Sequence, residues 1–132
     1  HDLELERVKI EKRIESDLPK ILADKREMQQ IFFNLIRNAG QAIEQTGTIT
    51  IKATSIWDDK VHIEIQDNGK GIAEDKKNRI FEPFFTTKGP KGGTGLGLSI
   101  VRQLVWRNKG EISFTSQVGI GTTFILDFPK GA

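Results

Sequence analysis

The sequence predicts an α/β (α+β) two-layer sandwich: a mixed, mostly antiparallel sheet of about five strands with three helices on one face. Two observations support this fold class. Apolar and polar residues alternate with the period of a β-strand in several separate segments. Two longer segments instead show the apolar spacing of amphipathic helices. With 132 residues, the chain is expected to form a single domain that can bury a core.

The composition argues against several classes of protein. The chain has 20 lysines and arginines against 18 aspartates and glutamates, a net charge of +2, so neither nucleic-acid binding nor direct membrane contact is expected. It has no cysteine, which excludes disulfides and thiol chemistry. No apolar run approaches the roughly 20 residues that cross a bilayer, and no signal peptide opens the chain. These features favour a cytoplasmic location.

The first third of the chain is predicted to form a strand, a short extended piece at residues 21–23 and a long helix. Asp24 is the expected N-cap of a helix over residues 25–45, with Glu27 as its capping-box partner. Thr46 and Gly47 would end that helix. The preceding strand is expected to have one solvated face, because charged residues alternate with its apolar positions, which are Val8, Ile10 and Ile14.

A stripe of amide side chains borders the apolar arc of this predicted helix. Asn34 and Asn38 are four residues apart, so their amides lie on one side of the helix, and Gln41 and Gln45 continue the stripe. The stripe is either a solvated face or part of a functional site. Asparagine is a poor helix former, because its amide competes for backbone hydrogen bonds. The pattern therefore favours a site.

Two strands over residues 49–54 and 61–66 are predicted to form a hairpin whose connection is residues 57–60. Continuing the alternation of the second strand places Asp67 on the inward face and His62 on the outward face. An inward carboxylate needs a partner, because an unpaired buried charge is very costly. Asp67 either caps the following glycine turn as an Asx-turn residue or binds a ligand. The outward phase of His62 argues against a catalytic or metal-binding role.

The second half of the chain contains a short helix at residues 74–80, an irregular aromatic segment at residues 81–85 and a glycine-rich loop. Pro83 excludes a helix interior from the aromatic segment. Five glycines fall within residues 89–97, directly before a predicted helix and beside two lysines. Backbone amides at such a helix start bind anions, which favours a phosphate site over a flexible linker. A closing hairpin places Thr122 inward, near Asp67.

Together these motifs resemble the catalytic, ATP-binding domain of sensor histidine kinases, a member of the superfamily that includes DNA gyrase B, the MutL repair proteins and the large ATP-dependent chaperones. The resemblance covers nearly the whole chain. Residues 34–39 resemble the family's asparagine box, and residues 67–71 its first glycine box. Residues 81–88 resemble its phenylalanine box and residues 93–98 its second glycine box. Residues 119–124 resemble its closing strand.

The resemblance implies roles for individual residues. Asp67 would accept the exocyclic amine of adenine, with Thr122 assisting through water, and Gly71 would let the backbone approach the base. Asn38 would bind Mg²⁺ with Asn34 beside it. The implied catalytic residues are Asn34, Asn38 and Lys88. The other implied nucleotide-binding positions are Ala42, Gly69, Ile72, Phe81, Thr87, Gly93, Thr94, Gly95, Leu96, Gly97 and Leu98. Residues 86–94 would form a flexible lid.

The resemblance also implies a reaction. The hydrolysing relatives carry a glutamate at the position of Asn34, whereas an amide cannot act as a general base. This favours donation of the γ-phosphate to a protein histidine. Neither His1 nor His62 lies in a phosphoacceptor motif. Residues 1–132 would therefore be the ATP-binding catalytic domain of a larger sensor kinase, without its phosphoacceptor and dimerisation helices. A hydrolysing ATPase, a serine protein kinase and a nucleotide-regulated binding module remain alternatives.

The implied partners are the phosphoacceptor and dimerisation domain of the same kinase and a response regulator downstream. The isolated domain would be a monomer and the parent kinase a homodimer. The chain departs from the family pattern in two places. Gly40, Gln41 and Ala42 stand where many members carry a basic and an aromatic residue, which resembles the NtrB-like branch. Residues 107–110 replace the His-Gly-Gly that relatives of this branch often carry.

Overall fold

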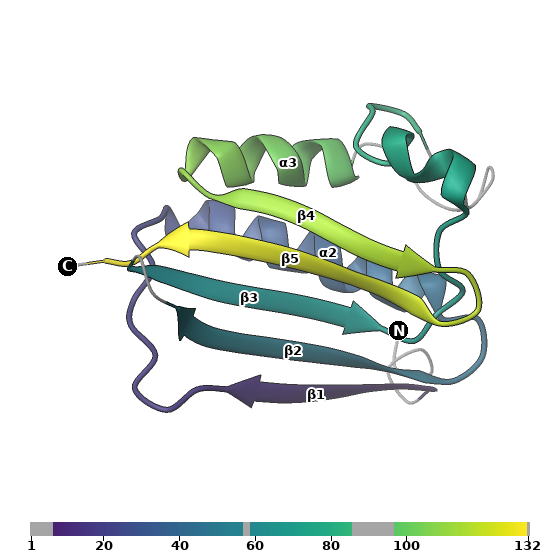
Figure 1. Cartoon of the computed structure of the whole chain (residues 1–132), viewed down its shortest axis with the longest axis horizontal. Helices are drawn as coiled ribbons and strands as arrows, with labels where there is room; N and C mark the ends of the chain where they lie inside the picture. Colours follow the sequence, from purple (N-terminus) through teal and green to yellow (C-terminus); the bar gives the residue numbers. More distant parts are fainter. Residues whose placement is uncertain (1–6, 57–58, 86–96, 132) are drawn as a thin grey trace.

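The computed structural model describes residues 7–56, 59–85 and 97–131 as one sheet with helices packed on it (Figure 1). The strand order is β1-β2-β3-β5-β4. The β1–β2 pair is parallel, and the other three pairs are antiparallel. This confirms the predicted mixed, mostly antiparallel sheet. The elements are β1 (Val8–Ile14), α2 (Lys25–Ala42), β2 (Gly47–Ile56), β3 (Lys60–Asp67), the 3₁₀ helix η1 (Glu74–Arg79), α3 (Gly97–Arg107), β4 (Glu111–Gln117) and β5 (Gly121–Pro129).

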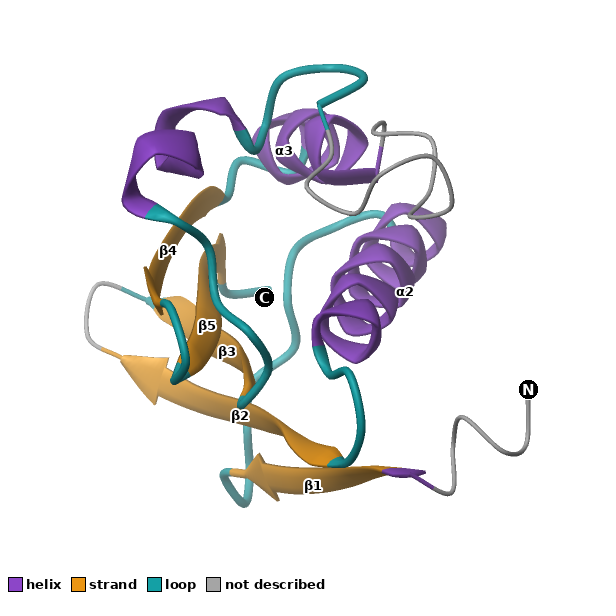
Figure 2. Ribbon diagram, turned by 90° about the vertical axis from the view of Figure 1, so that its right-hand side faces the viewer, coloured by secondary structure: helices purple, strands orange, loops and turns teal. Residues whose placement is uncertain are grey.

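The sheet and the two α-helices form two layers. Figure 2 shows α2 and α3 side by side on one face of the sheet, with the strands forming the other layer. Inward residues of the three central strands fill the space between the layers together with the apolar arc of α2 and one side of α3. The largest fully buried side chains are Phe128, Ile31, Leu35, Ile49, Ile65, Leu126, Val61, Val101 and Val105. No helix among the described residues is long and apolar enough to cross a membrane.

Helix α2 begins where the sequence predicted and ends earlier. Asp24 Oδ1 accepts a hydrogen bond from Glu27 N at 2.9 Å, which confirms the N-cap. The predicted end at Gln45 is wrong, because the helix stops at Ala42 and Ile43 adopts an extended conformation. In that conformation the Ile43 side chain is buried in the core. The Arg7 guanidinium donates to the carbonyl oxygens of Ile43 at 2.7 Å and Gln45 at 3.2 Å, so these groups need no further helical turn.

The predicted helix end at Thr46 and Gly47 is also wrong, because Gly47 is the first residue of β2. A second contact holds the chain where it leaves α2. The carbonyl oxygen of Ala42 accepts a hydrogen bond from Lys70 N at 3.0 Å. The end of α2 is thereby attached to the loop that follows β3.

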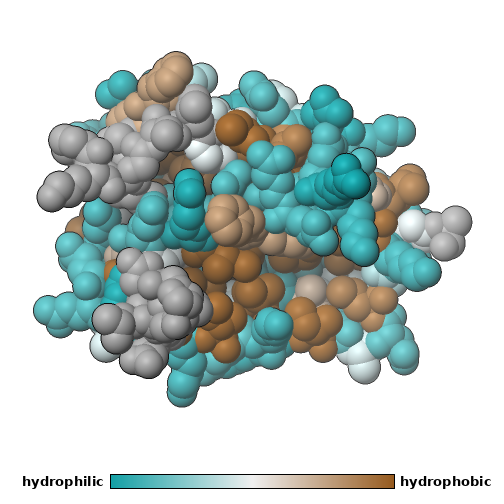
Figure 3. Space-filling model, turned by 180° about the vertical axis from the view of Figure 1, so that it is seen from behind, coloured by the Kyte–Doolittle hydropathy of each residue, from teal (hydrophilic) through white to brown (hydrophobic). Residues whose placement is uncertain are grey.

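The edge strand β1 differs from the other strands in its burial. Ile10 and Ile14 pair in register with Ile49 and Ala53 of β2, so their side chains lie on the helix-covered face of the sheet. Nevertheless 42% of Ile10 and 52% of Ile14 is exposed. Figure 3 views the molecule from behind, with α2 nearest the viewer, and shows apolar surface open to solvent on this side. The predicted strand is confirmed, but both of its faces are largely solvated.

A buried asparagine ties the end of α3 to the start of α2. Asn108 Oδ1 accepts a hydrogen bond from Asp24 N at 2.8 Å. Its Nδ2 donates to Glu27 Oε1 at 3.0 Å and to the carbonyl oxygen of Leu104 at 2.8 Å. Arg107 adds an ion pair with Glu27 at 3.0 Å. Arg107 and Asn108 therefore have a structural role between the two helices.

Candidate functional site

The candidate site is organised around Asp67, the last residue of β3. Only 3% of Asp67 is exposed, and its backbone is paired with Thr122 of β5 on one side and Ile49 of β2 on the other. The inward phase predicted from strand alternation is therefore confirmed. Asp67 Oδ1 accepts a hydrogen bond from Gly69 N at 2.8 Å, so the Asx-turn interpretation holds as well. The turn uses Oδ1 and is compatible with a ligand at the same carboxylate.

The loop after Asp67 is fixed on both sides. Asn68 Oδ1 accepts a hydrogen bond from Thr48 N at 2.8 Å, which ties the loop to β2. The carbonyl oxygen of Lys70 accepts from Gly119 N at 3.0 Å, which ties it to the β4–β5 hairpin. Gly71 has a φ of +78°, and a Cβ there would overlap the backbone of Gln117. The first glycine box is thus required by packing, and close approach of Gly71 to a base remains a prediction.

Gly69 and Ala42 lie together, and nucleotide binding at these two positions stays a prediction. A Cβ on Gly69 would meet the carbonyl oxygen of Ala42 at 2.5 Å. This close contact places the start of the loop against the C-terminal end of α2.

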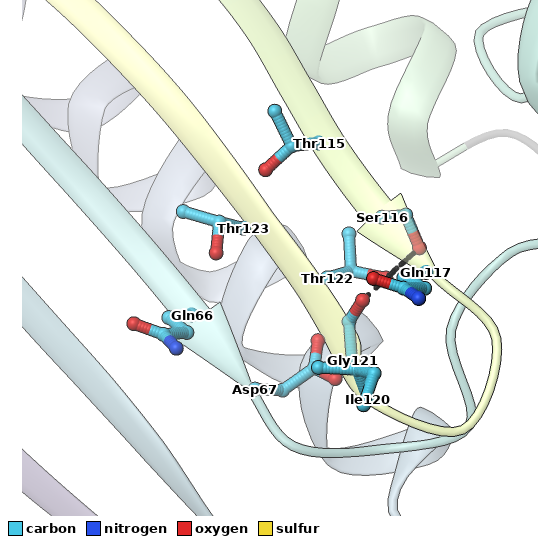
Figure 4. A pocket seen from close by; sticks show the side chains of 9 residues that line it. All are labelled: Gln66, Asp67, Thr115, Ser116, Gln117, Ile120, Gly121, Thr122 and Thr123. Carbon is cyan, nitrogen blue, oxygen red and sulfur yellow. Dashed lines mark hydrogen bonds between the residues drawn. The ribbon is translucent and has the colours of Figure 1, made fainter.

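A pocket of about 210 Å³ opens at this end of β3, β4 and β5 (Figure 4). Its lining combines Asp67, Ser116 and Thr122 with the turn residues Ile120 and Gly121 and with side chains of the outer face, which are Gln66, Thr115, Gln117 and Thr123. The pocket therefore lies at the open end of these strands and includes both faces of the sheet. Thr122 is 5% exposed, and its Oγ1 lies 2.7 Å from Ser116 Oγ. The predicted inward position of Thr122 near Asp67 is confirmed.

Sequence reasoning did not identify Ser116 or Gly121 as part of the site. Ser116 continues the inward alternation of Ile112 and Phe114, so strand phase alone could have identified it. Its Oγ also accepts a hydrogen bond from Ile72 N at 2.8 Å, which connects Ile72 to the site. A Cβ at Gly121 would overlap the carbonyl oxygen of Asp67, and this close approach depends on strand pairing that the sequence does not display.

The predicted amide stripe is present on α2 but is shorter than predicted. Asn34 and Asn38 are half-buried and border the fully buried Ile31 and Leu35. Gln41 is exposed, and Gln45 lies beyond the helix end. Asparagine amide oxygens are suitable ligands for Mg²⁺, which also retains water and phosphate oxygens as ligands. Among the residues that the structure describes, no group of three or more His, Cys, Asp or Glu side chains could hold a metal ion.

The phenylalanine box is irregular and anchored by aromatic packing, as predicted. Not all of its rings take part in that packing. Phe81 packs edge-to-face against Phe114 and Phe124, with ring centroids 5.9 Å and 6.3 Å apart. The Arg79 guanidinium lies 4.6 Å from the ring centroid of Phe85. Phe84 instead has a φ of +67° and is largely exposed. Phe81 thus occupies the core beside the site, whereas Phe84 faces solvent.

The second glycine box is described only at its end. Helix α3 begins at Gly97, and Gly97 and Leu98 in its first turn are both half-buried. Helix α3 packs against α2, the helix that carries Asn34 and Asn38 (Figure 2). Several predicted site residues and the predicted lid, residues 86–94, lie outside the described residues. These site residues are Thr87, Lys88, Gly93, Thr94, Gly95 and Leu96.

His62 lies on the outer face of the sheet, as its phase predicted. Its Nδ1 is 2.7 Å from Asp127 Oδ1, and its Nε2 is 2.9 Å from Glu64 Oε2. Burial alone would lower the pKa of His62, but the hydrogen bonds to Glu64 and Asp127 and their negative charges raise the pKa above its usual value. His62 is thus held between two carboxylates on the face opposite Asp67.

Known proteins are similar to this chain in sequence and in fold. The family model that matches residues 23–132 is described as histidine kinase-, DNA gyrase B-, and HSP90-like ATPase. The sensor histidine kinase ZraS of Escherichia coli (strain K12) is 46% identical over 112 residues, which are 85% of this chain and 23% of ZraS. The chain therefore spans less than a quarter of that curated relative.

Two solved histidine kinase structures are also similar. The catalytic domain of histidine kinase ThkA superposes with a TM-score of 0.83 at 32% identity, over 98% of this chain and 83% of that domain. Full-length ShkA, solved in complex with AMPPNP, gives a TM-score of 0.84 at 32% identity, over 99% of this chain and 28% of ShkA. The assignment to an NtrB-like branch stays a prediction. By its sequence and its fold, the chain belongs to the histidine kinase-, DNA gyrase B- and HSP90-like ATPase family and resembles the catalytic domains of histidine kinases throughout its length.

Proposed function

We propose that this chain binds Mg-ATP and donates the γ-phosphate to a histidine on a partner phosphoacceptor and dimerisation domain, as the catalytic domain of a two-component sensor histidine kinase. The observation that carries the proposal is the buried Asp67 beside Thr122 at the end of β3, on the helix-covered face of the sheet. Asp67 already accepts the Gly69 N–H, and a carboxylate can accept several hydrogen bonds at once. An exocyclic amine of a bound base supplies a further donor.

The chemistry of Asp67 favours adenine among the purines. An ionised carboxylate only accepts hydrogen bonds. Adenine carries an amine donor at its position 6, whereas guanine carries a carbonyl oxygen there. That oxygen would face the carboxylate with no proton between them. Asp67 would therefore stabilise ATP and disfavour GTP in the same orientation.

The phosphate end would be held by α2 and by the start of α3. Asn38, with Asn34 beside it, would bind Mg²⁺, which neutralises the phosphate charge when bound. Lys88 and the backbone amides of the second glycine box would bind the phosphates directly. The N-terminus of α3 adds the partial positive charge of a helix end.

The proposed reaction is in-line phosphoryl transfer. A ring nitrogen of the acceptor histidine forms a bond to the γ-phosphorus, and the bond from phosphorus to the β–γ bridging oxygen breaks. ADP leaves, and the proton of the attacking ring is released to solvent. This chemistry depends mainly on positioning and charge stabilisation. Asn34 cannot act as a general base toward water, which favours transfer over hydrolysis.

The acceptor would come from another domain. His62 is engaged by Asp127 and Glu64 on the outer face of the sheet, opposite the candidate site. The 112 matched residues are 23% of ZraS, so most of that relative lies outside the match. This is compatible with further domains in such kinases. We propose a cytoplasmic domain that is monomeric alone, a homodimeric parent kinase and a response regulator as the downstream partner.

The proposed function is tested in two steps. Calorimetric titration with ADP and ATP, each with and without Mg²⁺, should show binding that strengthens with Mg²⁺. The chain is then mixed with labelled ATP and a purified histidine-kinase phosphoacceptor helix pair, which should acquire acid-labile phosphate. Asn38→Ala should abolish this transfer.

Other results would indicate other functions. Acid-stable phosphate on the acceptor would indicate a serine kinase. Steady phosphate release by the isolated chain, lost in Asn38→Ala, would indicate a hydrolysing ATPase. Nucleotide binding without transfer to any acceptor would indicate a nucleotide-regulated binding module.

A further inference from the structure

Ser116 joins three parts of the candidate site that are distant in sequence. Its Oγ accepts a hydrogen bond from Ile72 N at 2.8 Å, in the loop that follows the first glycine box. The same atom lies 2.7 Å from Thr122 Oγ1 on β5, the contact marked by a dashed line in Figure 4. Its backbone carbonyl oxygen accepts a hydrogen bond from Lys77 Nζ of η1 at 2.7 Å. Ser116 is half-buried and paired with Thr122 across the β4–β5 ladder.

The hydrogen bonds of the Ser116 hydroxyl restrict the Thr122 hydroxyl. A serine hydroxyl has one proton and two lone pairs. One lone pair accepts the Ile72 N–H. The proton can go to Thr122 Oγ1 at 2.7 Å or to the carbonyl oxygen of Gly121 at 3.2 Å. The first distance is the usual one for a hydrogen bond between oxygens, and the second is longer than usual.

The two proton arrangements present different groups to a ligand. If Ser116 donates to Thr122, the proton of Thr122 can point toward a ligand beside Asp67, and Thr122 acts as a donor. If Thr122 donates to Ser116, only lone pairs of Thr122 can face that ligand. The 2.7 Å distance between the two hydroxyl oxygens fits either donor. A ligand with a hydrogen-bond acceptor at this point selects the first arrangement.

We propose that Ser116 is a positioning residue for adenine recognition. By donating to Thr122, Ser116 presents the Thr122 hydroxyl as a donor to the ring nitrogen beside the adenine 6-amine, directly or through one water. This inference rests on the proposed function, in which Asp67 accepts the amine. Asp67 and Thr122 then form an acceptor and a donor side by side, which matches the donor and acceptor pair on one edge of adenine.

The same strand provides a matched control. Ser113 lies in β4 in the opposite phase to Ser116 and is exposed on the outer face. Ser113→Ala therefore removes an identical group from the same strand without touching the pocket. Any loss that follows from weakening β4 itself should appear in both variants.

The test measures the affinities of the wild-type chain, Ser116→Ala and Ser113→Ala for ADP, 1-deaza-ADP and 7-deaza-ADP. The two analogues lack the ring nitrogens that flank the 6-amine on its two sides. Ser116→Ala should weaken ADP binding about three- to tenfold, the effect of one hydrogen bond. It should leave one analogue unaffected, which identifies the edge of adenine that Thr122 contacts. Ser113→Ala should change none of the three affinities.

The comparison between nucleotides on one variant cancels any general loss of folded protein. An equal loss for all three nucleotides would show that Ser116 only supports the fold, and no loss with ADP would also overturn the inference. If Ser116→Ala does not fold, Ser116→Cys keeps the shape of the side chain with a slightly larger atom and hydrogen-bonds only weakly, and the same expectations apply. Failure of the wild-type chain to bind ADP would overturn the proposed function as well, whereas normal wild-type binding confines a failure to Ser116.

Discussion

Two regions on the same face of the sheet depart in opposite ways from the usual distribution of polar and apolar residues. At the end of β3, Asp67 and Thr122 are polar but only 3% and 5% exposed. On β1, Ile10 and Ile14 are apolar but 42% and 52% exposed. The strand register places all four side chains on the helix-covered face.

The two regions differ in what covers them. The first is enclosed by the end of α2, by the loop that Lys70 attaches to Ala42, and by the β4–β5 hairpin. Helix α2 packs over β3 and β2 and leaves the edge strand open to solvent. Strand alternation therefore decides the face on which a side chain lies, whereas the covering elements decide its burial. Polar groups placed under such cover need hydrogen-bond partners, and Asp67 and Thr122 find them in Gly69 N and the Ser116 hydroxyl.

The largest expected effect comes from one substitution made in both regions. Ile65 of β3 is 1% exposed, whereas Ile14 of β1 is 52% exposed on the same face. Ile65→Ala should lower the free energy of unfolding by about 2–5 kcal/mol, because it removes buried methyl groups and leaves a cavity. Ile14→Ala should change it by less than about 1 kcal/mol. Urea denaturation of both variants measures the difference.

Equal losses in the two isoleucine variants would show that β1 is covered in solution. The interpretation of β1 as an open edge would then be wrong. A small loss in both would instead show that β3 is not the centre of the core.

A smaller effect is expected where the two helices of the covering layer are joined. Asn108 is buried and hydrogen-bonded to Asp24, Glu27 and Leu104. Asn108→Ala should lower the free energy of unfolding by about 1–3 kcal/mol, because the Asp24 N–H loses its partner. Thermal unfolding of this variant beside Lys109→Ala, an exposed neighbour, measures the effect. Matching melting temperatures for the two variants would rule out the proposed link between α3 and α2.

The smallest expected effect lies on the opposite face of the same strands. The pKa of His62 is raised in the folded chain, so its protonated form stabilises the fold. This stabilisation is fully present below the unfolded pKa of about 6.5 and is lost as the pH rises through the folded pKa. His62→Gln should therefore cost up to about 1 kcal/mol near pH 5.5 and less near pH 9. Urea denaturation of both proteins at the two pH values measures the change, and a cost that rises with pH would contradict it.

Local patterns predicted much of the site. Strand alternation placed Asp67 and Thr122 inward and His62 outward, because the side-chain period of a strand depends on the backbone alone. The same alternation reaches Ser116, which sequence reasoning overlooked. The N-cap role of Asp24 was equally local and was confirmed. The capping-box role of Glu27 was wrong, because Asp24 N donates to Asn108 Oδ1 and the Glu27 carboxylate pairs with Asn108 and Arg107.

Features that depend on distant segments were not predictable. Helix α2 ends at Ala42 because Ile43 enters the core and Arg7 takes up the carbonyl oxygens beyond it, and Arg7 lies 36 residues from Ile43. The exposure of Ile14 depends on where α2 packs. The contact between Asn108 and Asp24 joins residues 84 positions apart. Each depends on tertiary packing, which overrides local propensity.

The measurement that tests the central claim most directly is a calorimetric titration of the wild-type chain and Asp67→Asn with ADP and Mg²⁺. Asparagine keeps the size of the side chain, but its amide can offer a donor where the carboxylate only accepts. If Asp67 accepts the adenine amine, Asp67→Asn should weaken binding by about 1.5–3 kcal/mol, tenfold or more. Unchanged affinity in a variant that unfolds like the wild type would show that Asp67 does not bind the base.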